Sequence, residues 1–183
     1  MNEIQRVQQV LSGNASAFSY FVETYQHMAI TIAYRICGNM QDAEDVVQES
    51  FVKAYRNLHT FRRESKFSSW LYRIVYNTAI THFNAPVWKY ESDTPLTDLS
   101  LQSDFDVESK IAETEQAVMI TDVLEEMSKS DALLLTLYYL EDHSVKEVAE
   151  IIGLNESNVK VRLFRARQLF KQLWLRRYQA VSF

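Results

Sequence analysis

Apolar residues recur with the period of an α-helix along most of the chain, and the pattern is clearest from Ser144 to Trp174. The apolar positions of a first helix there, spaced at i, i+3, i+4 and i+7, are Val145, Val148, Ala149 and Ile152. Gly153 follows them, and a glycine in the left-handed conformation ends a helix at little cost. Asn155 can then cap a second helix. Two helices joined by so short a turn predict a helix-turn-helix.

The second of these helices separates an apolar stripe from a basic face. Its inward stripe is Val159, Leu163, Ala166, Phe170 and Leu173. The opposite side carries Ser157, Lys160, Val161, Phe164, Arg165, Gln168 and Lys171. From Ser157 to the C-terminus there are seven Lys or Arg and no Asp or Glu, although the whole chain has a net charge of −5. A basic face in an acidic protein predicts contact with phosphate groups.

Two alternatives stay open for this face. Its cations would also favour the C-terminal end of a helix that is merely solvated. Val161 and Phe164 lie on the outward side, where a solvated helix gains nothing from apolar residues. They would touch thymine methyl groups in a major groove or contact a partner protein.

Three further helices are predicted in the first half of the chain. The first runs from Ala15 to Ile36 and ends at Gly38 and Asn39. The second begins near Asp42, and its inner stripe is Ala43, Val47, Phe51, Ala54 and Leu58. Its opposite face holds Asp42, Asp45, Gln48, Glu49, Val52 and Arg56. The third runs from about Ser65 to Phe83, with the inner stripe Phe67, Trp70, Leu71 and Ile74.

The far side of the third helix is aromatic and apolar rather than polar. It holds Tyr72, Arg73, Tyr76, Ile80 and Phe83. Aromatic platforms beside cations bind single-stranded nucleic acid, whereas a small helical domain can also bury more than one stripe of a helix. The loop before it, His59–Lys66, brings Arg62, Arg63 and Lys66 together, either as a further nucleic-acid contact or as a solvated loop.

Composition and charge divide the chain into two helical domains. With Gly 3 and Pro 2, breakers are rare, and 47% apolar residues supply a core, so we expect an all-α fold. Residues 86–110 differ, because they hold two Lys against six acidic residues and lack an apolar period. We interpret them as a flexible acidic linker. The predicted domains are residues 1–85 and 111–183.

Several classes of protein are disfavoured. No apolar run is long enough to span a membrane, and the N-terminus lacks the pattern of a signal peptide. Cys37 is the single cysteine and is expected to be a small buried residue, which fits a reducing cytoplasm. The four His residues lack metal-ligand spacing, and no phosphate-binding glycine loop or nucleophile motif occurs. We therefore expect no metal, no cofactor and no enzymatic activity.

Two segments together resemble a known family. The segment DAEDVVQESFVKAYRNLHTFRRESKFSSWLYRIVYNTAI (Asp42–Ile80) is similar to region 2 of bacterial RNA polymerase sigma factors. The segment SVKEVAEIIGLNESNVKVRLFRAR (Ser144–Arg167) resembles region 4. Many regulators carry a helix-turn-helix, but the two motifs in this order and spacing are specific to sigma factors. With only a short linker between them, the chain resembles the extracytoplasmic-function group.

The resemblance implies a set of partners. In the family, the second helix of region 2 docks on a coiled coil of the polymerase β′ subunit. The matching residues here are Asp42, Asp45, Gln48, Glu49 and Val52. Region 4 is expected to contact the β flap of core RNA polymerase. An anti-sigma factor is a common further partner in the family, and promoter DNA is the ligand that both regions share.

The resemblance also implies two DNA sites. Family members hold the displaced strand of the −10 element under the loop before the third helix, where extruded bases bind better than stacked ones. The matching residues for the −10 element and melting are Arg62, Arg63, Lys66, Trp70, Arg73 and Asn77. Region 4 reads the −35 duplex, which implies Ser157, Asn158, Lys160, Val161, Arg162, Phe164, Arg165 and Arg167. Arg162 and Arg167 flank the inner stripe, so they would reach phosphate or brace the fold.

Two departures from the family pattern affect these expectations. Family members often have an arginine cluster after the third helix, whereas Thr81–Tyr90 reads THFNAPVWKY, with Lys89 as its one cation. Affinity for duplex DNA near the −10 element is therefore not implied. Many relatives have Ser where this chain has Val161, so one hydrogen bond to DNA is lacking.

Other functions compete with the sigma factor hypothesis. A helix-turn-helix regulator could bind DNA as a dimer without core polymerase, and stoichiometric binding to core polymerase would decide between the two. An adaptor that binds protein alone is a third hypothesis. It would be favoured if polymerase-bound promoter DNA showed no electrophoretic shift.

Overall fold

The computed structural model describes residues 2–83 and 113–179 of the 183-residue chain. Every regular element within these residues is a helix, which confirms the all-α prediction. The predicted linker, residues 86–110, lies outside the described residues. Contacts group the chain into two compact units, and the short segment Glu147–Gly153 is grouped with the first of them. The exact domain boundaries therefore stay a prediction.

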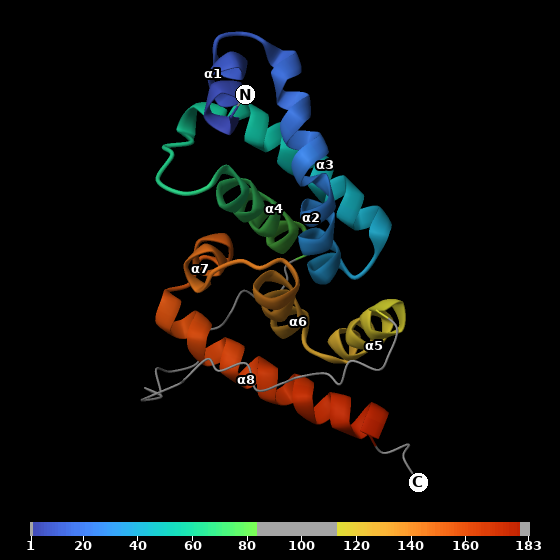
Figure 1. Cartoon of the computed structure of the whole chain (residues 1–183). Coiled ribbons are helices and arrows are strands. Elements are labelled where there is room, and N and C mark those ends of the chain that lie inside the picture. Colours follow the sequence, from blue (N-terminus) through green and yellow to red (C-terminus); the bar gives the residue numbers. More distant parts are fainter. Residues whose placement is uncertain (1, 84–112, 180–183) are drawn as a thin grey trace. The chain divides into compact units, whose positions relative to one another are not determined.

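The first unit is a bundle of helices (Figure 1). Its elements are α1 (Glu3–Leu11), the 3₁₀ turn η1 (Ala15–Phe18), α2 (Ser19–Cys37), α3 (Met40–Arg56), the 3₁₀ turn η2 (Leu58–Thr60) and α4 (Phe67–Phe83). Helices α2, α3 and α4 pack against one another. Each of the three therefore contacts two others, which determines how much of its surface is buried.

Capping residues set the helix ends of this unit. Gly38 ends α2 with a φ of 87°, and the Asn39 side chain accepts a hydrogen bond of 2.9 Å from the Asp42 backbone N–H at the start of α3. Asn2 and Gln5 form a capping box that starts α1. The sequence pattern had predicted where α2 ends and where α3 begins, but it did not identify α1.

Aromatic side chains fill the centre of the first unit. The Phe21 and Phe67 ring centroids lie 4.2 Å apart, which joins α2 to the start of α4. Phe61, from the loop before α4, lies edge-on to Phe67, and Trp70 also contacts Phe67. Pairs of this kind add to the burial of apolar area, so they hold the loop before α4 close to the core.

The burial of α4 corrects the prediction made for its two faces. Tyr72 and Tyr76 are each only 5% exposed, so they belong to the core and not to an aromatic platform. Trp70 and Ile74, predicted to point inward, are half-buried at the surface. Helix α4 packs against both α2 and α3, and a helix with two such neighbours buries more than one stripe. By contrast, the predicted inner stripe of α3 is buried throughout.

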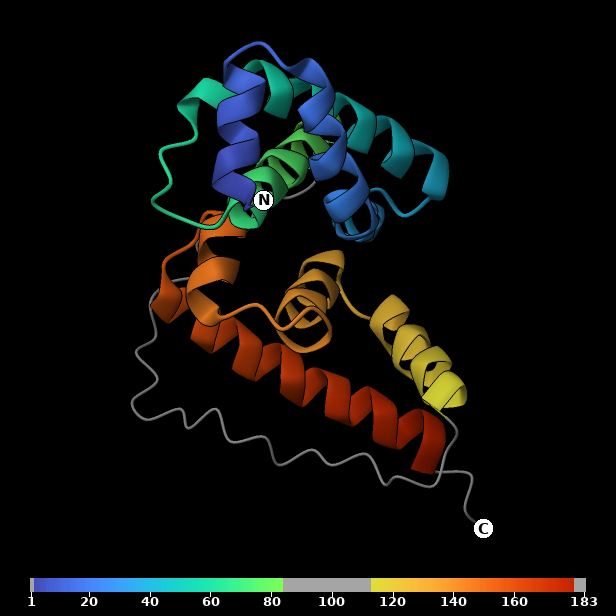
Figure 2. The same cartoon turned by 45° about the horizontal axis from the view of Figure 1, so that its top comes forward.

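The second unit is built around one long helix. Its elements are α5 (Glu113–Glu126), α6 (Lys129–Leu135), the π-helical turn η3 (Thr136–Leu140), α8 (Glu156–Trp174) and the π-helical turn η4 (Leu175–Gln179). Helix α7 (Val145–Ile152) comes directly before α8 in the chain, and most of it is grouped with the first unit. Figure 2 shows α5 and α6 along one side of α8, and both helices pack on it. Leu163 and Ala166 of α8 are buried, together with Leu133 and Leu134 of α6.

The turn between α7 and α8 has the predicted local geometry. Gly153 has a φ of +75°, and its N–H donates to the Ala149 carbonyl at 2.9 Å. The Asn155 side chain accepts a hydrogen bond of 2.7 Å from the Asn158 backbone N–H, which caps α8. Three residues thus join the two helices, as expected for a helix-turn-helix.

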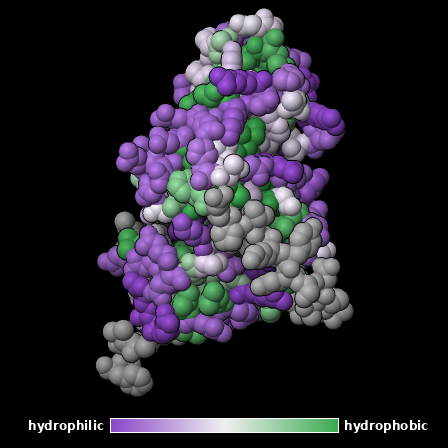
Figure 3. Space-filling view, turned by 180° about the vertical axis from the view of Figure 1, so that it is seen from behind, coloured by the Kyte–Doolittle hydropathy of each residue, from purple (hydrophilic) through white to green (hydrophobic). Residues whose placement is uncertain are grey.

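The face in Figure 3 is mainly hydrophilic, and its hydrophobic residues form small separate patches. Among the described residues, no helix is long and apolar enough to cross a membrane. Cys37 is buried, as the sequence predicted.

Candidate nucleic-acid and partner interfaces

Helix α3 presents part of the predicted partner surface to solvent. Asp45, Gln48 and Val52 are exposed, and Val52 is 48% exposed although it is apolar. Asp42 is half-buried and accepts a hydrogen bond of 2.6 Å from the Asn39 side chain. These residues follow one side of the helix at spacings of three and four. The result is an acidic surface with an exposed apolar residue at one end.

Glu49, the fifth predicted residue of this surface, is engaged within the protein. Its carboxylate lies 2.7 Å from the Lys53 ammonium one turn along α3 and 2.5 Å from His82 Nε2 on α4. The pKa of the Glu49 carboxyl lies below its ordinary value, mainly because Lys53 donates a hydrogen bond to it and secondarily because of His82. Glu49 therefore joins α3 to α4 as well as bordering the partner surface. The sequence pattern gave no sign of the His82 contact.

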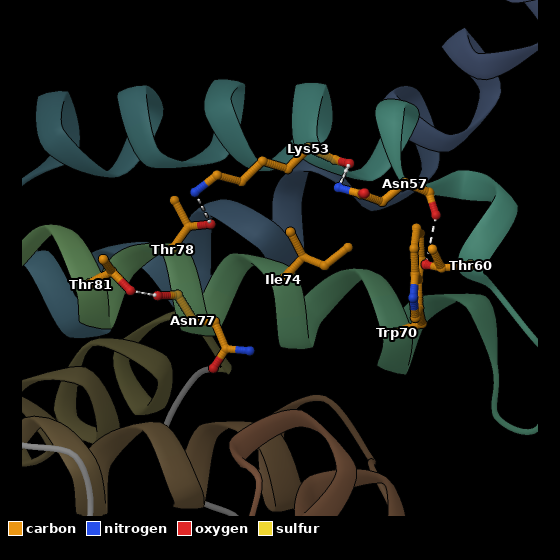
Figure 4. Close-up of a pocket in the computed structure, with 8 residues that line it drawn as sticks. All are labelled: Lys53, Asn57, Thr60, Trp70, Ile74, Asn77, Thr78 and Thr81. Carbon is orange, nitrogen blue, oxygen red and sulfur yellow. Dashed lines mark hydrogen bonds between the residues drawn. The ribbon is translucent and has the colours of Figure 1, made fainter.

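A pocket of about 340 Å³ opens between α3 and α4. Its lining residues are Lys53, Asn57, Thr60, Trp70, Ile74, Asn77, Thr78 and Thr81. In Figure 4 the Trp70 ring and Thr60 stand at one end, Ile74 lies in the middle, and the Lys53 amine reaches Thr78 toward the other end. The pocket thus has an aromatic end and a polar end.

The pocket contains only part of the set predicted for the −10 element. Trp70 and Asn77 line it. Arg62, Arg63 and Lys66 are exposed on the loop before α4, and Arg73 is exposed on α4; none of these cations lines the pocket. Lys53 does line it, and sequence reasoning did not identify Lys53. Lys53 and Asn57 lie four residues apart on α3, a spacing that could have suggested a shared face.

The loop before α4 also has an unusual backbone conformation. Arg63 has a φ of 62°, in the left-handed region that residues with a Cβ seldom adopt. Such a conformation costs free energy and persists where the surrounding structure holds it. Phe61, which packs on Phe67 and Trp70, anchors one end of this loop beside the pocket. The loop is therefore held close to Trp70 on one side and carries its cations outward.

Helix α8 presents the residues predicted to read DNA on its polar side. Ser157, Lys160 and Arg165 are exposed, whereas Asn158, Val161, Arg162, Phe164 and Arg167 are half-buried. The Arg167 guanidinium lies 5.8 Å from the centroid of the Phe164 ring. Val161 and Phe164 are thus less open than the helical pattern predicted. The exposed cations Lys160 and Arg165 lie five residues apart on the same helix.

Two of the seven predicted cations are neutralised within the second unit. Arg176 contacts Glu126 of α5 at 2.5 Å, and Arg177 contacts both Glu126 and Asp122, the latter at 2.9 Å. Tyr178 donates a hydrogen bond of 3.1 Å to Asp122. We call this network the C-terminal ion-pair network. The acid-free run in the sequence therefore overstated the basic face of this part of the chain.

This network makes the stability of the second unit sensitive to acid. The pKa of Glu126 lies below its ordinary value of 4.5, mainly because Arg177 and then Arg176 donate hydrogen bonds to it. A lowered pKa in the folded state stabilises the protein above the ordinary value, and this contribution is lost as the pH falls through the folded-state pKa. We expect Glu126→Gln to lower the Tm at pH 7 and the difference from the parent protein to shrink below pH 4.5.

The measurement is thermal unfolding followed by circular dichroism across that pH range. Glu125→Gln is the matched control, since Glu125 is an exposed neighbour on the same helix and has no place in the network. A Tm difference for Glu126→Gln that stays constant from neutral to acid pH would contradict the role of the ion pairs.

Within residues 2–83 and 113–179, no group of three or more His, Cys, Asp or Glu residues could hold a metal ion.

Comparison with known families matches both halves of the chain. The family model for sigma-70 region 2 matches residues 21–88, and the one for sigma-70 region 4 matches residues 117–170. These ranges contain the pocket and most of the polar face of α8, respectively.

Relatives match over nearly the whole chain. The chain is 30% identical to the ECF RNA polymerase sigma factor SigW of Bacillus subtilis over 178 residues, which is 92% of this chain and 95% of that protein. It is 32% identical to the ECF RNA polymerase sigma-E factor of Haemophilus influenzae over 181 residues, 92% of this chain and 91% of that protein. It is 34% identical to the RNA polymerase sigma-H factor of Pseudomonas aeruginosa over 173 residues, 90% of this chain and 89% of that protein.

Solved structures share the fold at lower identity. CnrH, solved in complex with the cytosolic domain of CnrY, has a TM-score of 0.64 and 24% identity, covering 97% of each chain. The sigma factor RpoE of Bartonella quintana, solved with the anti-sigma factor NepR, has a TM-score of 0.61 and 17% identity, covering 91% of this chain and 98% of that one. Family models, relatives and fold agree: the chain belongs to the extracytoplasmic-function sigma factors, non-enzymatic initiation factors that bind core RNA polymerase and direct it to specific promoters.

Proposed function

We propose that this sigma factor divides its work among three surfaces. The α3 surface, made of Asp42, Asp45, Gln48, Glu49 and Val52, docks on the β′ coiled coil of core polymerase. The pocket between α3 and α4 takes up an unpaired base of the −10 element. The polar side of α8 reads the −35 duplex. The main support for this proposal is the pocket, which is lined by Trp70 and Asn77 and is separate from the α3 surface beside it.

The α3 surface suits a basic helical partner. Asp45 and Gln48 are exposed, and the exposed apolar Val52 at the end of this surface adds contact area. Opposite charges across an interface steer the encounter and fix its register. Burial of Val52 against a partner would remove an exposed apolar side chain from water. An acidic surface with an apolar residue at one end therefore fits docking on a basic coiled coil.

The pocket suits an extruded nucleotide base. Stacking on an aromatic ring stabilises each unpaired base by about 1–3 kcal/mol and works for all four bases. Trp70 offers such a ring at one end of the pocket, and Ile74 gives an apolar middle (Figure 4). Capture of an unpaired base biases the DNA toward the open state and needs no covalent step. Arg62 and Arg63, exposed on the loop before α4, are positioned to contact the phosphate backbone.

The polar side of α8 suits a DNA major groove. Lys160 and Arg165 are exposed near the capped N-terminal half of the helix, which is the end that enters the groove in helix-turn-helix proteins. Arg readily donates two hydrogen bonds to a guanine edge, whereas cations at the rim contact phosphate. Arg165 is therefore the proposed base-reading residue, and Arg162 and Arg167 support the helix or contact phosphate.

Two further partners belong to this proposal. Region 4 would contact the β flap of core polymerase. An anti-sigma factor is proposed as a regulator, supported by CnrH-like and RpoE-like folds, the second of which was solved with an anti-sigma factor. Cytoplasmic action follows from a polymerase partner.

Core polymerase should be required for tight promoter binding. With Arg176 and Arg177 in the C-terminal ion-pair network, the cations left on α8 are Lys160, Arg162, Arg165, Arg167 and Lys171. If about four reach phosphates, the affinity of the free protein falls about a hundredfold between about 50 and 200 mM salt. We expect the free protein to bind a promoter weakly at physiological salt and the complex with core polymerase to bind it tightly.

The measurement is fluorescence anisotropy of labelled promoter DNA titrated with the protein, with and without core polymerase, over that salt range. Sub-nanomolar, sequence-specific binding by the free protein at physiological salt would contradict the proposal. It would favour a helix-turn-helix regulator that acts without polymerase.

A further inference from the structure

The polar end of the pocket is organised by a single cation. Lys53 is the one charged side chain among the eight residues that line the pocket. Its ammonium donates to Thr78 Oγ1 at 3.3 Å and contacts the Glu49 carboxylate at 2.7 Å. Thr78 is 3% exposed, so the Lys53 amine bridges from the surface of α3 to a buried group of α4. In Figure 4 this side chain runs from α3 toward Thr78, and it remains 42% exposed to solvent.

Glu49 holds the ammonium in this place. It lies one turn before Lys53 on α3, at the spacing that lets a carboxylate and an ammonium meet. His82 of α4 contacts the same carboxylate at 2.5 Å, which fixes Glu49 from the other helix. Charge-assisted hydrogen bonds of this kind are stronger than neutral ones. The position of the Lys53 amine is therefore set by two helices before any ligand arrives.

The ion pair of Lys53 and Glu49 has the chemistry to recognise an uncharged hydrogen-bond acceptor. A Lys ammonium has three N–H donors and no acceptor. Glu49 and Thr78 account for two of these donors, which leaves one for a ligand. A phosphate at this point would also face the Glu49 carboxylate, and like charges at such a distance repel. A carbonyl oxygen of a base carries no net charge, so it can accept from Lys53 without that repulsion.

The four bases differ in this respect. Cytosine, thymine and guanine each have a carbonyl oxygen, whereas adenine has an amino group and ring nitrogens but no carbonyl. Adenine could accept from Lys53 only at a ring nitrogen, and its N1 and N7 both adjoin the amino group, so that edge places a donor beside the ammonium. Trp70 at the far end of the pocket would stack on any base and so gives no discrimination. Discrimination among the four bases must therefore come from Lys53 at the polar end of the pocket.

We propose that Lys53 is a specificity-determining residue that makes the pocket accept a base with a carbonyl oxygen and disfavour adenine. This inference rests on the proposed function, in which the pocket takes an unpaired base of the −10 element. It assigns the choice among bases to a residue of α3, one turn from the surface proposed for core polymerase.

A selection experiment tests the assignment. The full-length protein with core polymerase selects from fork-shaped DNA whose unpaired non-template strand is randomised, and the bound molecules are sequenced. The wild-type complex should deplete adenine about fivefold at one position, the discrimination that one hydrogen bond supports. Lys53→Met keeps the length of the side chain and removes its donors. It should abolish the depletion at that position and leave the other positions unchanged.

A control variant tests whether the loss of any nearby cation has the same effect as the loss of Lys53. Arg56→Met removes an exposed cation of the same helix that does not line the pocket, so it should preserve the adenine depletion. The Tm of each variant shows whether the fold is kept. If Lys53→Met retains the depletion of adenine, or if it weakens binding to all DNAs by the same factor, the assignment is overturned.

A second experiment distinguishes two negative outcomes: that Lys53 has no role in base selection, and that the pocket binds no base at all. The same fork DNA is prepared with the base removed from each unpaired position in turn. If the pocket takes a base, removal at the adenine-depleting position should weaken binding to the wild-type complex at least fivefold. If no position responds to base removal, the pocket holds no base, and both proposals fail. A response to base removal without any effect of Lys53→Met refutes the role of Lys53 alone.

Discussion

Asp45→Arg is expected to weaken binding to core RNA polymerase about thirtyfold and to leave the first unit folded. Asp45 is exposed on α3 and belongs to no buried stripe, so its replacement should not change the Tm. In the complex the new guanidinium would face a basic partner helix. Like charges across an interface cost about 2 kcal/mol or more, and about 1.4 kcal/mol corresponds to a tenfold change in Kd. The measurement is the Kd of labelled protein titrated with core polymerase.

Glu23→Arg is the matched control for this charge reversal. Glu23 is an exposed carboxylate on α2 of the same unit and lies outside the α3 surface. Its reversal should change the Kd for core polymerase by much less. Binding of Asp45→Arg to a −35 duplex should equal that of the parent protein. Equal losses for Asp45→Arg and Glu23→Arg would show that net charge matters and that no local docking surface exists.

Arg165→Ala is expected to cost about 1–3 kcal/mol of discrimination between the preferred −35 sequence and a mismatched one, or roughly tenfold to a hundredfold. Arg165 is exposed on α8, outside the buried stripe of Val159, Leu163 and Ala166, so the fold should not change. Binding to core polymerase should also persist, because the α3 surface is unaltered. The measurement is the ratio of affinities of the complex with core polymerase for the two duplexes.

Lys171→Ala gives the contrast for that measurement. Lys171 is an exposed cation in the last turn of the same helix. If Lys171 contacts a phosphate, the substitution should weaken binding to both duplexes alike and reduce the salt slope by about one. The ratio of the two affinities should not change. If Arg165→Ala and Asp45→Arg lost the same activity to the same degree, the assignment of separate surfaces would be wrong.

Local patterns predicted the elements of this fold where one face of a helix is buried. The stripe of α3 repeats at three and four residues and is buried as expected, because one side of that helix stays open to solvent. Gly153 and Asn155 set the turn before α8 by their own backbone and side-chain chemistry, so the turn could be located from sequence alone. Such features depend on residues close together in the chain.

Features that depend on neighbours in space were missed or misplaced. Helix α4 contacts two helices, so Tyr72 and Tyr76 are core residues, which decides between the two alternatives that the sequence left open. Trp70 and Ile74, predicted to point inward, are only half-buried. The partners of Arg177 lie 51 and 55 residues away, which no helical period reveals. Lys53 reaches the pocket only because Thr78, 25 residues later, lies across from it. The polar half of the pocket could therefore be identified only from the structure, and not from the sequence pattern.

Transcription in vitro tests the central claim most directly. Core polymerase is mixed with a library of genomic fragments, with and without this protein, and the 5′ ends of the transcripts are sequenced. We predict that the protein produces a small set of discrete start sites that share −35 and −10 sequences, and that Asp45→Arg removes them all. Transcript ends that are the same with and without the protein, while it binds specific DNA alone, would contradict its assignment as a promoter-directing subunit of RNA polymerase.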